Sequence, residues 1–415
     1  MAAADTQTVP IEQIDLGSLE LWEQGPPHEV FERLRREAPV HWSEMADWEG
    51  EPGFWSITRA EDVHRISREW ETFSSEKGGI LVVDNGGVPL EQQNAMFIAM
   101  DPPRHDRIKA LFQRGFTPRR IAEHESRIRE IVERVLDGVE GLDEVDLVSQ
   151  VAQPVVARVI CSFLGTPEED DAIWADLANK GLAFGDEQLQ PEGQETVLKV
   201  VQEVYERVSA LAAERRANPT EDLTSVLVHA EVDGQRLEDH EIVFGFALLV
   251  AAGNDSTKGT FSSGMLALLQ NDDQRAKLLA DPSLIEGAVE EILRMYPAFA
   301  SFRRTASKDV ELHGKTIREG EKVVMWYPSS NRDEAVYECP HKLDVERDPE
   351  HQAFGAGGRH FCLGTALARL EIRILLEETL RRFPDMELVK SDAVRSLFIN
   401  QPREVRVRLN GVAGA

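Results

Sequence analysis

Apolar and polar residues follow two different periods along the chain, and together they predict a largely helical protein with a small β part. Near the N-terminus, residues 39–42 and 53–57 show the alternation of strands and are expected to pair in a small antiparallel sheet. Residues 75–100 show neither period and are predicted to be loop. From about residue 103 to residue 290 the spacing is helical almost throughout, with Pro and Gly as punctuation.

One predicted helix is nonpolar on nearly every side, at residues 242–252. Acidic Glu238, Asp239 and Glu241 precede it, which suits the positive end of a helix dipole. Because a helix without a polar face has to be buried, we expect this one to be central to the fold.

Strands are predicted again at residues 309–314 and 322–326, followed by a Gly-rich loop and an amphipathic helix at 363–383. The sequence contains no internal repeat and no long Gly/Ser- or Pro-rich linker. We therefore expect one domain, residues 1–415, that is mainly α with minor β.

Composition narrows the possible functions. Hydrophobic residues make up 42% and charged residues 29%, as in ordinary globular proteins, so wholesale disorder is excluded. The net charge of −28 would repel nucleic-acid phosphates and anionic lipids, so neither is an expected partner. The chain lacks an apolar run of the ~18 residues needed to span a bilayer, and its first residues do not resemble a secretory signal. We expect a cytoplasmic protein without a membrane anchor.

Three cysteines occur, Cys161, Cys339 and Cys362, and their spacing suits neither a zinc site nor a disulfide scaffold. Cys362 ends a glycine-rich run that starts at Phe354, directly before a predicted helix. Backbone N–H groups of such a turn can point at the sulfur and favour the thiolate, which is the metal-binding form. Cys161 and Cys339 lack this context and are interpreted as structural residues.

The run from Phe354 to Gly364 resembles the haem-ligand signature of cytochromes P450. This resemblance implies the P450 fold with a long central helix over the haem, Cys362 as the axial ligand to the iron, and Phe354 at the cofactor. Glu291 and Arg294 match the Glu-x-x-Arg motif of the family, and Arg347 matches the third member of its buried ion-paired group. That trio is assigned a structural role.

Further positions match the groups that bind the haem propionates in this family, namely His105, Lys109, Arg304 and His360. His105 and Lys109 are four residues apart, so they can share one carboxylate. Lys109 stands where Arg is commoner and supplies a point charge instead of a two-pronged donor. Arg303 and Arg359 are adjacent to the matched positions and could exchange roles with Arg304 and His360.

The segment Ala252–Thr257 resembles the oxygen-activation motif of the same family. Gly253 weakens the helix and is expected to let its backbone open beside a ligand, with the Ser256 hydroxyl reaching the Ala252 carbonyl. Asp255 and Ser256 then form an acid–alcohol pair that can relay protons. Ser256 replaces the usual Thr and lacks its methyl group, so coupling of electrons to product is expected to be leakier, and Thr257 is an alternative hydroxyl.

The resemblance implies a monooxygenase with haem b (iron protoporphyrin IX) that inserts one oxygen atom from O2 into a substrate. The interval from Phe354 to Cys362 is one residue longer than in many members, as in bacterial sterol side-chain and methyl-branched-lipid hydroxylases. A bulky hydrophobe is therefore expected: a steroid, terpenoid, alkyl or aromatic compound. The pocket walls are predicted to include Ile80, Val82, Phe184, Leu249, Ser301 and Phe398. Ordinary core packing is the alternative for each of them.

Two other functions stay open: a peroxide-using or non-oxygenating haem-thiolate enzyme, and a haem or lipid carrier. The acid–alcohol pair at Asp255 and Ser256 argues against both, because it serves dioxygen chemistry.

Electrons have to come from elsewhere, since the chain shows no flavin, nicotinamide or iron–sulfur fingerprint. Six basic residues are concentrated in a short segment against a single acid: Arg104, Arg107, Lys109, Arg114, Arg119 and Arg120. The resemblance places them on the cysteine side of the haem together with Arg369 and Arg373. We expect a small acidic ferredoxin, served by a ferredoxin reductase, to dock there on a monomer.

Overall fold

Strand β10 (Lys322–Trp326) is buried along its whole length. The computed structural model, which describes residues 9–84, 89–182, 194–232 and 234–409, explains why. Val324 and Trp326 belong to one hydrophobic cluster, whereas Val323 and Met325 belong to another. Since successive residues of a strand point to opposite faces, β10 is covered on both sides.

The described chain divides into two compact units, which we treat separately. The first unit contains residues 9–84, 259–362 and 383–409, and the second contains the described residues between 89 and 258 together with 363–382. Helices account for 53% of the residues, and the sheets are small, so the expected class of mainly α with minor β is confirmed.

The first unit is built on a five-stranded sheet with the order β1-β2-β10-β7-β3. Its other strands are β1 (Val40–Ser43), β2 (Phe54–Ile57), β7 (Ser301–Ala306) and β3 (Phe73–Ser74). Strands β1 and β2 are the two predicted near the N-terminus, and they pair antiparallel with Val40 opposite Ile57. Strand β10 then pairs with β2 in parallel and with β7 antiparallel.

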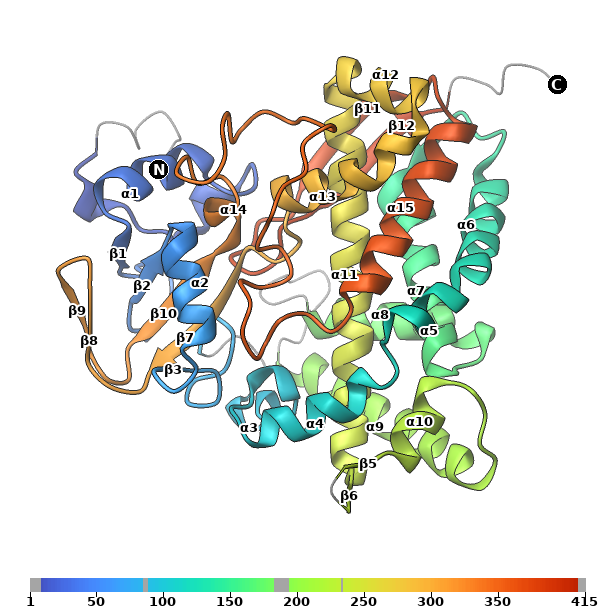
Figure 1. The fold of residues 1–415 in the computed structure, drawn as a ribbon, viewed down its shortest axis with the longest axis horizontal. Coiled ribbons are helices and arrows are strands. Elements are labelled where there is room, and N and C mark those ends of the chain that lie inside the picture. Colours follow the sequence, from blue (N-terminus) through green and yellow to red (C-terminus); the bar gives the residue numbers. More distant parts are fainter. Residues whose placement is uncertain (1–8, 85–88, 183–193, 233, 410–415) are drawn as a thin grey trace. The chain divides into compact units, whose positions relative to one another are not determined.

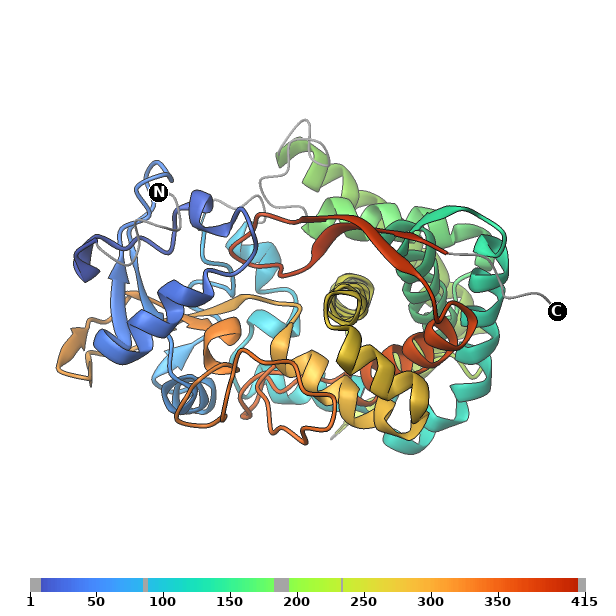
Figure 2. The ribbon, with the colours of Figure 1, turned by 90° about the horizontal axis from the view of Figure 1, so that it is seen from above.

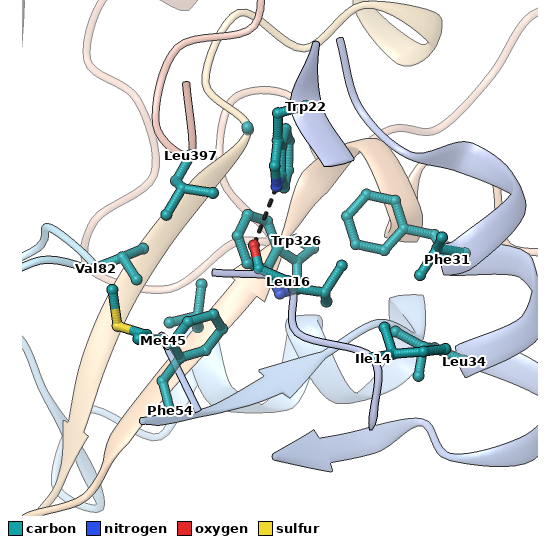
Figure 3. Close-up of a cluster of buried hydrophobic side chains, with 13 residues drawn as sticks. Ile14, Leu16, Trp22, Phe31, Leu34, Met45, Phe54, Val82, Trp326 and Leu397 are labelled. Atoms are coloured by element: carbon teal, nitrogen blue, oxygen red, sulfur yellow. Dashed lines mark hydrogen bonds between the residues drawn. The ribbon is translucent and has the colours of Figure 1, made fainter. Parts of the chain in front are cut away.

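Helices cover this sheet through the two hydrophobic clusters. In the cluster of Figure 3, the rings of Trp22 and Phe31 pack against Trp326, and Leu34 belongs to the same cluster. The indole N–H of Trp22 donates to the Leu16 carbonyl at 3.0 Å. Phe31 and Leu34 come from α1 (His28–Glu37), while α2 (Ala60–Arg68) contributes Val63 and Ile66 to the second cluster. The apolar stripes of α1 and α2 therefore supply the core of this unit.

The remaining elements of the first unit are mostly short. They are η2 (Ile11–Gln13), η3 (Leu19–Trp22), α12 (Asp272–Ala280), η7 (Pro282–Leu284), α13 (Ile285–Met295), α14 (Tyr327–Ser330), the hairpin β8 (Val310–Leu312) and β9 (Lys315–Ile317), and the hairpin β11 (Glu387–Ala393) and β12 (Pro402–Arg408). Figure 2 shows β11 and β12 side by side. In this unit the sequence pattern did not predict β3, β7, β9, β11 and β12. Strand β11 is mostly exposed and polar, so it lacks an alternating pattern.

The second unit is helical, as the spacing predicted. It contains α3 (Leu90–Gln93), η4 (Phe97–Ala99), α4 (Arg104–Gln113), α5 (Pro118–Glu123), α6 (Glu125–Val139), the π-helix η5 (Leu147–Ala152), α7 (Gln153–Leu164), η6 (Glu168–Asp170), α8 (Asp171–Leu182), α9 (Gln194–Ala217), α10 (Leu223–His229) and α15 (Thr365–Arg382), besides the short strands β4 (Glu144–Asp146), β5 (Glu231–Val232) and β6 (Gln235–Arg236). Helices α6 and α15 lie side by side (Figure 1). The predicted loop at 75–100 thus contains two short helical turns.

Helix α11 (Asp239–Gln270) contains the apolar segment that was predicted to be buried. At its start the backbone N–H of Glu238 donates to the Glu241 carboxylate at 3.0 Å, which satisfies one of the free donors of a helix N-terminus. Glu241 is buried and also pairs with Arg107 on α4. Glu241, in the first turn of α11, therefore both caps the helix and attaches it to α4.

Candidate active site

The loop that carries Cys362 turns on three glycines with left-handed backbone. Gly355, Gly357 and Gly358 have φ of 88°, 85° and 80°, values that residues with a side chain rarely adopt. The backbone N–H of Cys362 donates to the carbonyl of Phe354 at 2.9 Å and closes the loop. Helix α15 begins three residues later, at Thr365. The glycines thus fold the chain back just before the cysteine.

This loop is fixed against α2. Ser67 donates its hydroxyl to the Gly357 carbonyl at 2.9 Å. A Cβ atom on Gly358 would lie only 2.6 Å from the Ser67 carbonyl oxygen, so a side chain there would push the loop off the helix. His360 is hydrogen-bonded to the Ser75 hydroxyl at 3.2 Å. The position of Cys362 is therefore set by direct contacts to neighbouring segments.

The three cysteines differ in environment. Cys161 is buried, and burial raises the pKa of its thiol to about 12, so it stays protonated and inert. Cys339 and Cys362 are both exposed, but Cys339 lies in a turn without the glycine loop. Cys362 combines an exposed position with a loop that turns on three glycines. This donor and its surroundings fit a thiolate ligand facing a flat macrocycle such as haem.

A second feature of the first unit is a buried ion-paired group, formed by Glu291, Arg294 and Arg347. Arg294 donates to both oxygens of Glu291, at 2.7 and 2.8 Å, and Arg347 donates to Oε1 at 3.2 Å. The other guanidinium nitrogen of Arg294 donates to the carbonyls of Asn331 and Pro340. The group therefore ties α13 to the segment that leads into the cysteine loop.

In the second unit, His105 and Lys109 lie on one face of α4, and both are buried. The His105 ring is hydrogen-bonded to Asp106 at 2.9 Å. A buried histidine and a buried ammonium one helical turn apart suit an anionic carboxylate such as a haem propionate.

Arg303 and Arg304, adjacent on β7, have different surroundings. Arg303 forms an ion pair with Asp84 and also donates to the Leu81 carbonyl at 3.4 Å. Arg304 donates to the carbonyl of Arg303 at 2.8 Å. Because Arg303 anchors the segment that carries Leu81 and Asp84, Arg304 is the better candidate for a cofactor carboxylate.

Helix α11 carries the acid and the alcohol of the oxygen-activation motif. The Ser256 hydroxyl donates to the Ala252 carbonyl at 2.6 Å, which is the hydrogen bond predicted from the sequence. The predicted opening at Gly253 is not seen, because α11 is helical without a break through this segment. A Cβ atom on Gly253 would meet Ile160 of α7 at 3.3 Å, so this glycine permits close helix packing. Thr257, the alternative hydroxyl, is buried.

The side chains that bind Asp255 through hydrogen bonds and an ion pair were not predicted from the sequence. Lys258 donates to the Asp255 carboxylate at 2.5 Å and to the Gln153 amide oxygen at 3.1 Å. The Gln153 amide nitrogen donates to Asn254 at 2.6 Å. The spacing of Asp255 and Lys258, three residues apart on a helix, was a signal for this pair.

The predicted pocket walls are buried wherever the structure describes them, but their surroundings differ. Phe398 contacts Phe299 and Phe302, with ring centroids 5.1 and 5.5 Å away. Neither Phe299 nor Phe302 was singled out from the sequence. Val82, in contrast, packs in the core cluster of Figure 3 and is a core residue.

The other predicted walls are distributed over both units. The Ser301 hydroxyl donates to the Leu397 carbonyl at 2.7 Å, and the Ile80 carbonyl accepts from the Arg303 backbone at 2.9 Å. Leu249 is buried on α11 in the second unit. Phe184 lies outside the described residues.

Comparison with known proteins decides what these features belong to. The family model for cytochrome P450 matches residues 187–400. The methyl-branched lipid omega-hydroxylase of Mycobacterium tuberculosis is 37% identical over 403 residues, which cover 94% of each chain. The chain belongs to the cytochrome P450 family. The family and the bacterial branch predicted from the cysteine loop are thereby confirmed.

Two further relatives support this membership. The steroid C26-monooxygenase of Mycolicibacterium smegmatis is 32% identical over 400 residues, covering 94% of this chain and 92% of that protein. A Mycobacterium marinum cytochrome P450 solved in complex with pseudoionone has a TM-score of 0.88 and 37% identity, covering 97% and 99% of the two chains. The P450 fold is confirmed, and the enzyme is a cytochrome P450 monooxygenase.

The basic segment of this P450 is only partly exposed. Three of its residues are exposed: Arg104 on α4, Arg114 directly after α4, and Arg119 on α5. Lys109 is buried, and Arg107 is paired with Glu241. Within the same unit, Arg373 of α15 is paired with Glu125 and Glu377. The exposed positive charge is therefore carried by fewer residues than the sequence suggested.

One segment of this P450, Leu147–Leu164, is long and apolar enough to cross a membrane. It comprises η5 and α7, and 72% of it is buried inside the protein. Burial of this kind is typical of a core helix in a folded domain.

Proposed function

We propose that this P450 inserts one oxygen atom from O2 into a bulky hydrophobic substrate, using electrons from a ferredoxin that a ferredoxin reductase keeps reduced. The observation that carries the proposal is the glycine loop that fixes an accessible Cys362 directly before α15. A thiolate-ligated haem b at Cys362 would supply the oxygen activation.

The side chains proposed to hold the cofactor have distinct tasks. Cys362 supplies the thiolate, while His105, Lys109, Arg304 and His360 neutralise and hydrogen-bond the two propionates. Phe354, whose carbonyl closes the cysteine loop, is proposed to lie at the cofactor. Ala252 and Gly253 are proposed to lie beside the macrocycle, because neither carries a large side chain, and Gly253 in addition lets α11 pack closely against Ile160 of α7.

Asp255, Ser256 and Thr257 are proposed to deliver protons. The Ser256 hydroxyl is already oriented by its bond to the Ala252 carbonyl, so it can receive a proton from Asp255 and pass its own proton on. Thr257 is the alternative hydroxyl because it follows Ser256 directly and is buried.

The substrate is proposed to be a steroid, terpenoid, branched alkyl or aromatic compound. Supporting this, relatives with similarity over nearly the whole chain are named for methyl-branched lipids and steroids. Within the first unit, Ile80 and Phe398 are buried and apolar, and Phe398 contacts Phe299 and Phe302, as expected for the walls of a site that binds such compounds. Leu249 of the second unit is buried as well and is proposed as a further wall.

We further propose that residues 1–415 function as a single P450 domain, as a cytoplasmic monomer. The ferredoxin would dock on the face of α4 and α5 that exposes Arg104, Arg114 and Arg119, because exposed cations steer an acidic partner to an otherwise acidic protein.

The test is turnover under 18O2 with ferredoxin, its reductase and a panel of a steroid, a branched fatty alkyl lipid and an acyclic terpenoid. Binding is first scored by the substrate-induced spin-state change of the haem spectrum. The proposal expects a product with one 18O atom, and none without the electron donor. An equally fast reaction with hydrogen peroxide alone, or a product without label, would exclude it.

A further inference from the structure

An arginine is buried in the first unit without an acidic partner. Arg332, two residues after α14, exposes only 3% of its surface. Its Nε and Nη1 atoms are buried, and neither finds a hydrogen-bond acceptor in the part of the chain that the structure describes. The guanidinium carbon lies 5.7 Å from the centre of the Tyr296 ring, a contact that compensates a buried charge less than a carboxylate does. Arg332 thus carries a positive charge that is hidden from water and largely uncompensated.

The neighbouring arginines differ from Arg332, because each of them has its own acid. Arg35 of α1 donates from Nε and Nη2 to the Glu334 carboxylate, at 2.9 and 2.6 Å. Arg294 of α13 donates to both oxygens of Glu291. These two carboxylates are therefore already engaged, and they do not neutralise Arg332.

The cost of this arrangement is reflected in the pKa of Arg332. Burial is the largest cause, and it lowers this pKa to about 10. The charges of Arg294 and Arg35 lower the pKa as well, whereas Tyr296 and Glu291 raise it without restoring its usual value. The guanidinium still carries its charge at neutral pH. A negative charge placed beside Arg332 would therefore be strongly attracted.

A second unsatisfied group comes from the start of α1. The Nδ1 atom of His28, the first residue of this helix, is buried and has no hydrogen-bond partner among the described residues. Burial is the largest cause that lowers the pKa of His28, and the charge of Arg332 is the next. The imidazole and the guanidinium therefore lie close enough to interact. Because no side chain caps the N-terminus of α1, the positive end of its dipole also lies at His28.

The acids near His28 are engaged with other cations or histidines. Oε2 of Glu32 lies 3.8 Å from Nε2 of His341, whose ring makes an edge contact with His28 at a centroid distance of 6.1 Å. Glu334 binds Arg35. The compensating negative charge therefore has to come from solvent. Because Arg332 is almost wholly covered, a partner protein has no access to it, whereas a monovalent ion such as chloride occupies about the space of a buried water molecule.

We propose that a halide-sized monovalent anion, chloride under ordinary conditions, binds between the Arg332 guanidinium and the His28 imidazole at the N-terminus of α1. The anion accepts hydrogen bonds from Nε and Nη1 of Arg332 and from Nδ1 of a neutral His28, so that all three buried groups are satisfied. It neutralises the buried charge and ties α1 to the segment after α14. The role of this site is structural, and it does not depend on the proposed monooxygenase reaction.

The first test locates the ion without any substitution. Crystals of the haem-loaded wild-type protein are grown with sodium bromide in place of sodium chloride, and an anomalous difference map is measured at the bromine absorption edge. A bromide peak within hydrogen-bond distance of Nε and Nη1 of Arg332 and of Nδ1 of His28 is expected. Density at this position without an anomalous signal would be water and overturns the proposal. Bromide at exposed side chains alone would be an adventitious ion only and overturns it as well.

The second test measures binding in solution. Urea unfolding of the holoenzyme is followed in mixtures of sodium chloride and sodium gluconate, so that ionic strength and the screening of surface charges stay constant. Chloride should stabilise the folded state in a saturable way, and at ten times its Kd it should lower the unfolding equilibrium constant about tenfold. Arg332→Gln should abolish this dependence, and Arg36→Gln, which alters an exposed arginine of α1, should keep it. A wild type that does not respond to chloride, or a response that survives Arg332→Gln, overturns the proposal.

A further variant covers the case in which Arg332→Gln does not fold. His28→Phe removes the Nδ1 donor but keeps an aromatic ring, so the Kd for chloride should rise several-fold. His341→Phe changes the ring that contacts His28 and is the matched control, with the Kd of the wild type expected. An unchanged Kd in His28→Phe overturns the proposal, as does an equal rise in both variants, which would assign the effect to packing of the two rings.

Discussion

Arg294 donates two hydrogen bonds to Glu291, from Nε to Oε2 at 2.7 Å and from Nη2 to Oε1 at 2.8 Å, and neither side chain exposes any surface. Such a two-pronged pair is geometrically specific, and removing one partner leaves an uncompensated buried charge. Arg347 donates to the same carboxylate from the segment before the cysteine loop. The integrity of that loop thus depends on the pair.

Glu291→Gln or Arg294→Leu should lower the free energy of unfolding by about 3–5 kcal/mol, because the first leaves the buried Arg294 without its carboxylate and the second leaves the buried Glu291 with only the longer bond from Arg347. Urea unfolding measures the effect, and the double substitution should cost less than the sum of the single ones. Arg36→Ala, which removes an exposed ion pair with Glu37, is the control and should leave stability unchanged. Equal effects of Arg294→Leu and Arg36→Ala would contradict the assignment.

A second prediction concerns pH. Burial raises the pKa of Glu371 on α15 well above its usual value. The folded chain therefore keeps a proton that the unfolded chain releases near pH ~4.3. Stability linked to this group is complete below that pH and declines as the pH rises toward the folded-state pKa. Glu371→Gln should remove this decline, so its advantage over wild type in urea unfolding should grow between about pH 5 and about pH 8.

Glu378 on the same helix is the matched control, with the opposite sign. Although burial opposes it, hydrogen bonds from Arg381 and Arg129 lower the pKa of Glu378. Glu378→Gln should therefore lose stability at neutral pH, and this loss should shrink as the pH falls through the folded-state pKa. If both substitutions shift stability in the same direction at neutral pH, the account of Glu371 is wrong.

Sequence reasoning succeeded where a residue's chemistry is set by its near neighbours in the chain. The glycine loop before Cys362 and the Ser256–Ala252 hydrogen bond are such cases. The strands β1 and β2 were predicted from the local alternation of their residues, and Val40 and Ile57, which pair across them, are both buried in one cluster. The long helix α11 was predicted from its continuous apolar composition.

It failed where partners come together only in the fold. Gln153 meets Lys258 across a separation of 105 residues, and Arg303 meets Asp84 across 219. Val82 reads as a candidate pocket residue, but it lies in the same buried hydrophobic cluster as Trp326. Gly253 was expected to open α11, yet tight packing against Ile160 accounts for a small residue there without any break.

The proton relay gives a third prediction. Ser256→Ala removes the hydroxyl that Asp255 would serve, so consumption of reducing equivalents should continue while a larger share appears as hydrogen peroxide. Asp255→Asn should slow turnover by about 10²-fold with little loss of haem, since proton transfer by a positioned acid contributes on that order. Product, peroxide and electron consumption are measured together. Unchanged coupling in Ser256→Ala would transfer the role to Thr257.

A fourth prediction concerns the docking of the ferredoxin. Arg114→Glu and Arg119→Glu reverse exposed charges on the α4–α5 face, and together they should slow reduction by the ferredoxin by roughly tenfold at low salt. Substrate binding, followed by the spin-state change, should be intact. Arg36→Glu, on α1 in the other unit, controls for net charge. Reduction that neither these reversals nor added salt slows would place docking elsewhere.

The central claim, that Cys362 binds haem iron as a thiolate, is tested most directly by the absorption spectrum of the reduced protein with carbon monoxide. A strongly electron-donating thiolate shifts the Soret band to the red. We predict this band for wild type and for variants with Ala in place of Cys161 or Cys339, and its loss in Cys362→Ala. A histidine-type band in the native protein, or a thiolate band that survives Cys362→Ala, would contradict the account.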